Sequence, residues 1–179
     1  MKYLILILLI SLVACHEQTK PANQKTEDRV ASSQFHIPDS NYVILNYKGD
    51  YHWFFKDSKP TTLTKSELAE VEIIIEKAIK ENNDQQRETL EIHNRQYPDN
   101  QWKETGYELE KKRFKRQYVP VINSDGQKEI WINFFCSDLG SENWKSDIMI
   151  VLDGGNCYFN LKVNLKTRSY SGLSVNGYA

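Results

Sequence analysis

Residues 64–82 read TKSELAEVEIIIEKAIKEN, and this stretch decides the fold. Thr64 and Glu67 have the Thr-x-x-Glu spacing of a capping box, in which each side chain binds a backbone N–H of the other residue. The stretch predicts an amphipathic helix over Lys65–Asn82, because its apolar residues recur every three or four positions and face a core. These residues are Leu68, Val71, Ile74, Ile75, Ala78 and Ile79. Three acidic residues are assigned to the solvent side of the helix: Glu70, Glu72 and Glu76.

From Gln117 onward the chain consists of short β-branched and aromatic runs separated by turn residues. Two of the links contain Asp-Gly, which is typical of β-hairpin turns. The predicted strands are Tyr118–Ile122, Glu129–Cys136, Ile148–Leu152, Cys157–Leu165 and Ser169–Asn176. A helix followed by hairpins predicts an α+β domain, with one long helix packed on a twisted antiparallel β-sheet.

Alternation along these strands separates an apolar face from a polar face, because successive strand residues point to opposite sides. Ile130, Ile132 and Phe134 share the apolar side, which we expect to pack against the helix. The other side carries amides and aromatic rings, groups that suit peptide or glycan recognition. We therefore expect an exposed candidate binding face formed by Trp131, Asn133, Tyr158 and Asn160.

Two further elements are predicted before this sheet. Tyr42–Tyr47 and Tyr51–Phe55 are aromatic and β-branched runs, and the glycine-containing link between them favours a hairpin. A second helix is predicted over Gln86–Arg95, before Pro98 and Gly106 break the pattern.

The first 15 residues have the composition of an export signal. Lys2 is followed by an apolar run that is too short for the ~20 residues that span a bilayer. Leu12-Val13-Ala14-Cys15 resembles the lipobox of bacterial lipoproteins, in which the cysteine thiol carries a diacylglyceryl group and becomes the new N-terminus. We therefore expect residues 1–14 to be a signal peptide and Cys15 to be lipidated. An ordinary secretion signal is the alternative.

Residues 15–40 are predicted to form a flexible tether between the lipid and a single domain at 41–179. The segment is nearly all polar, so it cannot bury enough apolar surface to offset its ordering entropy. A coil of ~20 residues spans on the order of 25 Å. The sequence thus predicts a lipid-anchored protein of the bacterial cell envelope, at the outer membrane, with the periplasmic or surface face left open.

The charge pattern argues against nucleic acid as a partner. Without residues 1–14 the chain holds 22 basic and 24 acidic residues, a net charge of −2. Five basic residues fall within Lys111–Arg116, directly after a block at 81–110 with eight acidic and three basic residues. We expect the basic run to be self-paired or solvated, and contact with anionic lipid headgroups stays open.

Cys136 and Cys157 lie in predicted strands of an exported protein, where disulfides persist. In a simple meander the strand at 148–152 separates their strands, which then lie about 9.6 Å apart, beyond the ~7 Å limit between bonded Cα atoms. The sequence therefore favours buried free thiols and leaves a Cys136–Cys157 disulfide open.

Four C-terminal motifs resemble those of small, uncharacterised lipoproteins of Bacteroidota. They are YVPVIN at 118–123, WIN at 131–133, DGGNCYFN at 153–160 and VNGYA at 175–179. The resemblance covers roughly the last third of the chain, and it implies a bacterial envelope setting but no activity and no site. The order of helix and sheet is also similar to cystatin-like and PepSY-like folds, and this analogy of shape carries no function.

No stretch after Cys15 has the spacing of a metal, phosphate or catalytic motif, so no catalytic residue, metal ligand or cofactor is predicted. The favoured interpretation is a non-enzymatic binding or structural module whose partner is an envelope protein, a peptide or a glycan. The alternative is an envelope hydrolase with a site assembled from distant residues, such as His93 with Asp153 or Cys157.

Overall fold

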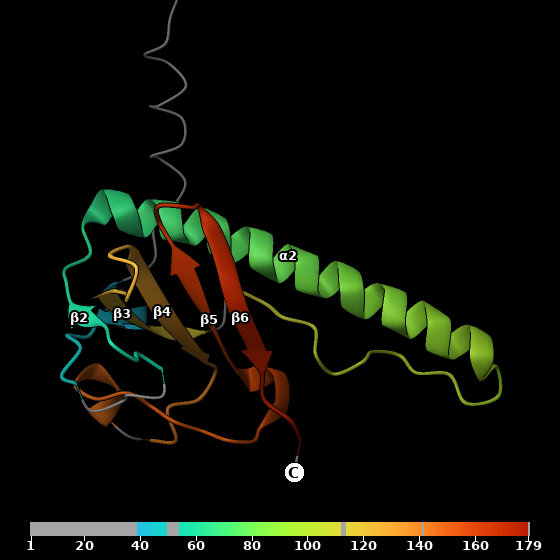
Figure 1. Cartoon of the computed structure of the whole chain (residues 1–179). Helices are drawn as coiled ribbons and strands as arrows, with labels where there is room; N and C mark the ends of the chain where they lie inside the picture. The colour runs from blue at the N-terminus through green and yellow to red at the C-terminus, as the bar shows by residue number, and fades with distance from the viewer. Residues whose placement is uncertain (1–38, 50–53, 112–113, 141, 179) are drawn as a thin grey trace, which may run out of the picture. The chain divides into compact units, whose positions relative to one another are not determined.

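The computed structural model describes residues 39–49, 54–111, 114–140 and 142–178. The predicted signal peptide, Cys15 and nearly all of the predicted tether lie outside these ranges, as does most of the predicted strand Tyr51–Phe55. The described residues form one long helix, α2, over a β-sheet (Figure 1). Within the described ranges no helix is both long and apolar enough to cross a bilayer.

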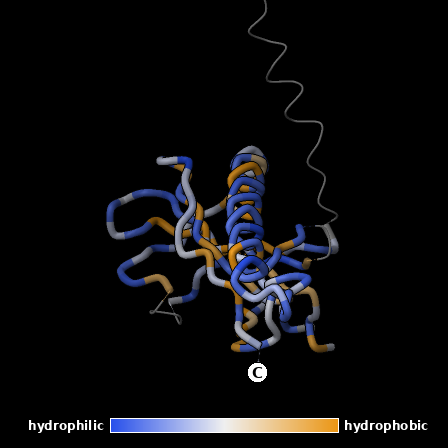
Figure 2. Tube along the Cα trace, turned by 90° about the vertical axis from the view of Figure 1, so that its right-hand side faces the viewer, coloured by the Kyte–Doolittle hydropathy of each residue, from blue (hydrophilic) through white to orange (hydrophobic). Residues whose placement is uncertain are grey.

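Helix α2 spans Lys65–Gln96 and begins with the predicted capping box. The Glu67 N–H donates to Thr64 Oγ1 at 3.2 Å, and the Thr64 N–H donates to a Glu67 carboxylate oxygen at 2.9 Å. Figure 2 shows hydrophobic and hydrophilic segments alternating along this helix. Its buried residues all lie between Val71 and Ile79, so only the first half of α2 packs on the sheet.

The prediction of two separate helices is wrong, because the second half of α2 continues the first. The chain continues through Asn82–Gln85 without a break, and the helix reaches 32 residues, a length of about 48 Å at 1.5 Å per residue. Across the predicted break, Asp84 binds Lys80 at 2.5 Å and Arg87 at 2.7 Å. No glycine or proline interrupts this region, so the polar sequence continues the helix.

The sheet confirms the predicted α+β fold, and its order is β1-β3-β4-β5-β6, with β2 pairing β3. Strands β3 to β6 form two antiparallel hairpins that pair with each other through β4 and β5. Their bounds are Lys115–Ile122 for β3, Lys128–Phe135 for β4, Tyr158–Asn164 for β5 and Ser169–Val175 for β6.

The first strands differ from the predicted hairpin. Strand β1, Tyr42–Ile44, runs parallel to β3, and the short β2, Lys59–Pro60, pairs antiparallel with the other end of β3. The sheet is therefore mixed rather than wholly antiparallel. The predicted strand Ile148–Leu152 is also wrong, because this segment runs outside the sheet and leaves β4 and β5 as direct neighbours.

Strands β3 and β4 are buried on both faces, whereas the polar positions of β5 and β6 are mostly half-buried or exposed. One face packs on α2 through residues that include Ile130, Ile132 and Phe134, as predicted. The other face is covered by two smaller apolar clusters, one around Phe55 and one around Trp144. The predicted division into a dry and a wet face is therefore wrong for β3, β4 and the start of β5, where residues 43–49, 54–55 and 144–157 cover the expected wet face.

Candidate functional site

The four residues of the predicted binding face lie under these loops. Trp131 is 2% exposed, and Asn133 and Tyr158 are each 9% exposed. Asn160 is half-buried, and its side-chain oxygen accepts a hydrogen bond from the Trp131 indole N–H at 3.3 Å. The expectation of an exposed contact face is therefore wrong for these residues. These residues lie beneath the covering loops.

Two buried amides hold one of these loops in place. Asn133 Nδ2 donates to the Met149 carbonyl at 2.7 Å, and the Met149 N–H donates to Gln117 Oε1 at 2.9 Å. Gln117 Nε2 donates to the carbonyls of Trp144 and Asp147, each at 2.6 Å. Buried amides that satisfy backbone groups fix this loop, whose only regular structure is the short 3-10 helices Glu142–Lys145 and Gly155–Cys157. Asn133 is thus a positioning residue.

The loop that they hold borders an apolar groove of about 210 Å³. Met149 and Val151 pack inward on the Trp144 cluster, while Ile150 and Leu152, which alternate with them, are exposed. The groove is lined in part by Leu139, Trp144, Met149, Ile150 and Val151. Asn176 donates to the carbonyls of Val151 and Asp153 at 2.7 and 2.9 Å, so both ends of segment 149–153 are braced.

A disulfide joins Cys136 to Cys157, with 5.1 Å between the Cα atoms. The predicted preference for free thiols is wrong, because the strand expected between the two cysteines is absent and β4 pairs directly with β5. The Cys136 N–H also donates to the Cys157 carbonyl at 3.0 Å. The bond closes the loop that carries the groove.

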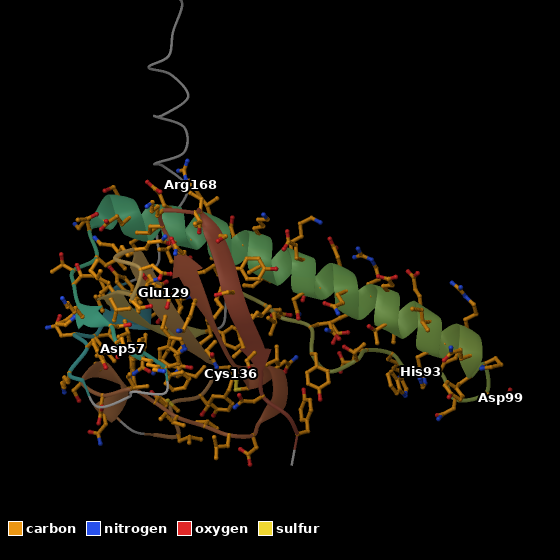
Figure 3. The ribbon with its side chains drawn as sticks, in the orientation of Figure 1. Asp57, His93, Asp99, Glu129, Cys136 and Arg168 are labelled. Carbon is orange, nitrogen blue, oxygen red and sulfur yellow. A yellow bond between two sulfur atoms is a disulfide. The ribbon has the colours of Figure 1, made fainter. Side chains whose placement is uncertain are left out.

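The residues suggested for a hydrolase are not brought together. His93 lies near the far end of α2, well separated from Cys136 (Figure 3). The His93 ring stacks on Trp102 at 3.4 Å between centroids, and its Nε2 contacts the Asn100 carbonyl at 3.1 Å. Cys157 is bonded to Cys136 and is therefore not a free thiol. The pairing of His93 with Cys157 is therefore excluded by position, and the His93 ring contacts Tyr97, Trp102 and Asn100 rather than Asp153.

The second half of α2 and the chain that returns along it form a projecting arm, residues 81–110. Figure 1 shows this half of the helix extending past the strands, with the returning strap, residues 97–110, beside it. None of the helix residues from 80 to 96 is buried. The arm holds eight acidic and three basic residues, a net charge of −5.

An amide ladder binds the strap to the helix in place of a hydrophobic core. Asn83 makes two hydrogen bonds to the Leu109 backbone, at 2.9 and 2.8 Å, and Asn94 makes two to the Trp102 backbone, at 3.0 and 2.7 Å. Asn82 and Gln86 complete the ladder, with bonds of 2.9 Å to the Tyr107 carbonyl and 2.8 Å to the Thr105 hydroxyl. Helix residues three, four, seven or eight apart share a face, so these amides line one side.

The arm ends in an aromatic tip of His93, Tyr97 and Trp102. His93 lies between the two other rings, 4.8 Å from Tyr97 and 3.4 Å from Trp102 by centroid. Tyr97 is 54% exposed and Trp102 is 44% exposed. The sequence offered one signal for this feature: the amides Asn82, Gln86 and Asn94 recur at helical spacing in a segment with few apolar residues.

The C-terminal motifs fasten the root of the strap to the domain. The Tyr178 hydroxyl donates to the Gly106 carbonyl at 2.8 Å, and Asn156 Nδ2 donates to the Glu108 carbonyl at 2.9 Å. The Tyr178 ring lies so close to Gly155 that a Cβ there would be 2.1 Å from a ring carbon. Gly155 has φ +59° as well, so this position requires glycine for both space and backbone conformation.

The prediction that Glu72 lies on the solvent side of the helix is wrong. Its buried carboxylate binds Arg116 at 2.7 Å and Lys111 at 3.0 Å, and it accepts a hydrogen bond from the Tyr118 hydroxyl. Burial and the adjacent carboxylate raise the pKa of Tyr118 well above its usual value of 10.0. Leu68 and Ile75 lie four residues before and three after Glu72, so the apolar stripe itself placed Glu72 on the buried face.

The basic run is self-paired where it is described. Lys111 binds Glu76 at 2.7 Å in addition to Glu72, and Lys115 pairs with Asp138. The pairing is internal, as expected, but the partners Glu72, Glu76 and Asp138 lie outside the neighbouring acidic block at 81–110. Residues 112 and 113 lie outside the described ranges.

Within the described part of the chain, no group of three or more His, Cys, Asp or Glu residues is arranged to hold a metal ion. Comparison of the chain with protein-family models, curated proteins and solved structures gives no match.

Proposed function

We propose that this chain is a lipid-anchored protein of the bacterial envelope that works as a non-enzymatic binding module, with the aromatic tip of its arm as the contact surface for an envelope protein. The observation that carries the proposal is the arm itself. It projects beyond the sheet and ends in exposed aromatic rings at Tyr97 and Trp102.

The construction of the arm supports a binding role. Most of the stability of a helix in a protein comes from packing of an apolar face, and this half of α2 buries no side chain in the core. The amide ladder supplies the stability that packing does not, at hydrogen bonds of 2.7–3.0 Å. A rigid arm loses little conformational entropy when a partner binds, so its contacts contribute more fully to affinity.

The chemistry of the tip favours a protein partner. Tryptophan and tyrosine are enriched among the residues that dominate binding energy at protein interfaces, because they bury a large area with few rotatable bonds. The net charge of −5 on the arm favours a partner surface that is basic around an apolar pocket, since complementary charge speeds association and selects partners.

The proposed lipid anchor is supported by the lipobox-like sequence Leu12–Cys15 and by the polar segment that follows it. Two or more acyl chains hold a protein stably at a bilayer, because each buried CH₂ contributes ~0.8 kcal/mol. Incorporation of labelled fatty acid into the wild-type chain, and its loss in Cys15→Ser, tests this part of the proposal. Equal labelling of both chains contradicts it.

Site-specific photocrosslinking in living cells tests the contact surface. A photoreactive phenylalanine analogue at Trp102 is expected to crosslink one envelope protein, whereas the same analogue at Ile73 is not. Ile73 is a matched control because it is 51% exposed on the first half of the same helix. An identical crosslinking pattern at both positions contradicts the proposal, as does the absence of any adduct at Trp102.

A second measurement asks whether the tip supplies the binding energy. The double variant Tyr97→Ala, Trp102→Ala retains the backbone bonds from Asn94 to residue 102. We expect at least about a 30-fold loss of affinity for the crosslinked protein, since a single hot-spot side chain contributes ~2 kcal/mol or more. The melting temperature is expected to change little. Unchanged affinity in the variant excludes the aromatic tip as the contact.

A further inference from the structure

The two most exposed large apolar side chains of the described residues belong to the loops around the groove. Leu152 is 88% exposed and Leu139 is 70% exposed, and Ile150, at 47%, lines the groove together with Leu139. We name these three residues the aliphatic patch. Single exposed apolar residues are ordinary on a protein surface, but Leu139 and Ile150 line one groove and Leu152 follows Ile150 by two residues, and clustered apolar exposure indicates a contact surface.

The patch is held rigidly. Met149 and Val151 are anchored through their backbones by Asn133 and Asn176, so Ile150 and Leu152 are presented outward by a segment that cannot fold inward without breaking these bonds. The covering loop is also closed by the disulfide at its base. An apolar surface braced in this way does not collapse onto the domain, and it stays available to an external apolar phase.

We propose that the aliphatic patch docks on a phospholipid bilayer and inserts into the boundary between headgroups and acyl chains. The composition of the patch distinguishes it from the aromatic tip: leucine is under-represented among protein-interface hot spots, whereas apolar side chains insert readily at a membrane surface. This inference goes beyond the proposed binding function, although the position of the patch beside a bilayer rests on the proposed lipid anchor.

Because of the proposed tether, even weak insertion of the patch would be enough to hold the domain against the bilayer. The predicted tether, residues 15–38, would span on the order of 25–30 Å as a coil of ~24 residues, a reach that would keep the domain near the surface that holds the proposed lipid. Attachment through the lipid turns patch insertion into an intramolecular step with an effective concentration of about millimolar order. The bilayer is then the apolar phase that this patch meets most often.

The charges around the patch specify the type of lipid contact. Asp138 is paired with Lys115, and Lys145 lies 5.7 Å from the centre of the Trp144 ring. Asp147 lines the groove and Asp153 follows Leu152, so the surroundings carry no excess of positive charge. Insertion is therefore driven by apolar burial, and it requires no anionic headgroup.

Flotation with lipid vesicles tests the inference independently of lipidation. The chain used is residues 15–179 with Cys15→Ser, and the vesicles contain phosphatidylcholine and phosphatidylethanolamine. The patch variant carries Leu139→Ser, Ile150→Ser and Leu152→Ser. A matched control carries Ile73→Ser and Ile92→Ser, which remove apolar side chains that are 51% and 45% exposed on α2.

The parent chain is expected to partition onto the vesicles with a constant somewhat below the ~10⁴ M⁻¹ of a single myristoyl chain. The patch variant is expected to lose at least about tenfold in partitioning, because its three inserted side chains no longer bury apolar surface, while the control changes less than about twofold. The single variant Leu152→Ser, at the most exposed position, is expected to lose part of the binding at unchanged melting temperature.

Three results overturn the inference: no partitioning of the parent chain, an equal loss in patch and control variants, or partitioning that requires anionic lipid and disappears in salt. The last result assigns membrane contact to the basic run at Lys111–Arg116 instead. Crosslinking at Trp102 and fatty-acid labelling at Cys15 do not depend on this outcome, so failure of the patch is distinguishable from failure of the proposed function.

Discussion

Removing the amide ladder should detach the strap while leaving the domain folded. The double variant Asn83→Ala, Asn94→Ala deletes four hydrogen bonds of 2.7–3.0 Å between helix α2 and the backbone of residues 102 and 109. A typical hydrogen bond contributes ~0.5–1.5 kcal/mol net, and these are partly exposed to water, so the variant should lower the free energy of strap opening by about 2–3 kcal/mol. Exchange of strap amides should then accelerate roughly 30- to 150-fold.

Hydrogen–deuterium exchange followed by mass spectrometry measures this directly. Peptides from 98–108 should exchange faster, whereas peptides from β4 and β5 should keep their protection, because Leu109, at the root of the strap, is the only arm residue buried in the core of the sheet. Gln85→Ala, a substitution at an exposed residue of the same helix, is the control. Unchanged strap exchange would refute the role of the ladder. Equal acceleration in β4 would show that the arm and the sheet unfold together.

Three further changes act on the body of the domain. Glu72→Gln leaves a buried arginine without its carboxylate, so the free energy of unfolding in urea should fall by about 3–5 kcal/mol. A fall of less than about 1 kcal/mol would contradict the importance of the buried pair. Reducing the disulfide, whose cysteines are 21 residues apart, should lower the unfolding free energy by about 3 kcal/mol, measurable by unfolding with and without reductant. Hydrogen bonds from Lys128 and the Thr64 backbone lower the pKa of Glu67 below its usual value of 4.5. Ionised Glu67 therefore stabilises the folded state above pH 4.5, and this stabilisation is lost as the pH falls below that value. Glu67→Gln should flatten this acid loss in unfolding measured from pH 3 to 6, and an unchanged acid limb would contradict the assignment.

Helix α2 illustrates what local pattern predicts well. Its start was predicted correctly, because Thr64 and Glu67 form the cap from residues three positions apart. Its apolar stripe was assigned to the correct layer for the same reason. The end of the helix was predicted wrongly, at Asn82 instead of Gln96. The continuation depends on amides that bind a strap up to 26 residues further along the chain, and such contacts have no local signature.

The candidate site was harder to predict than the fold. The polar residues Asn133 and Tyr158 were assigned to a surface because they alternate with apolar neighbours. In the structure each is 9% exposed, since segments from outside the sheet fold over them. Glu72 was misplaced for a related reason: a carboxylate on an apolar stripe is buried only when a partner such as Arg116 arrives from another strand.

The sequence by itself determined the helix start, the β3–β4 hairpin and the α+β class, because caps, periodicity and Asp-Gly turns depend on residues within a few positions of each other. Tertiary structure alone decided which polar side chains are buried, that Cys136 faces Cys157, and that exposed aromatic and aliphatic residues gather at the arm tip and the groove. Burial and proximity depend on which distant segments meet, and that choice follows from the free energy of the whole chain.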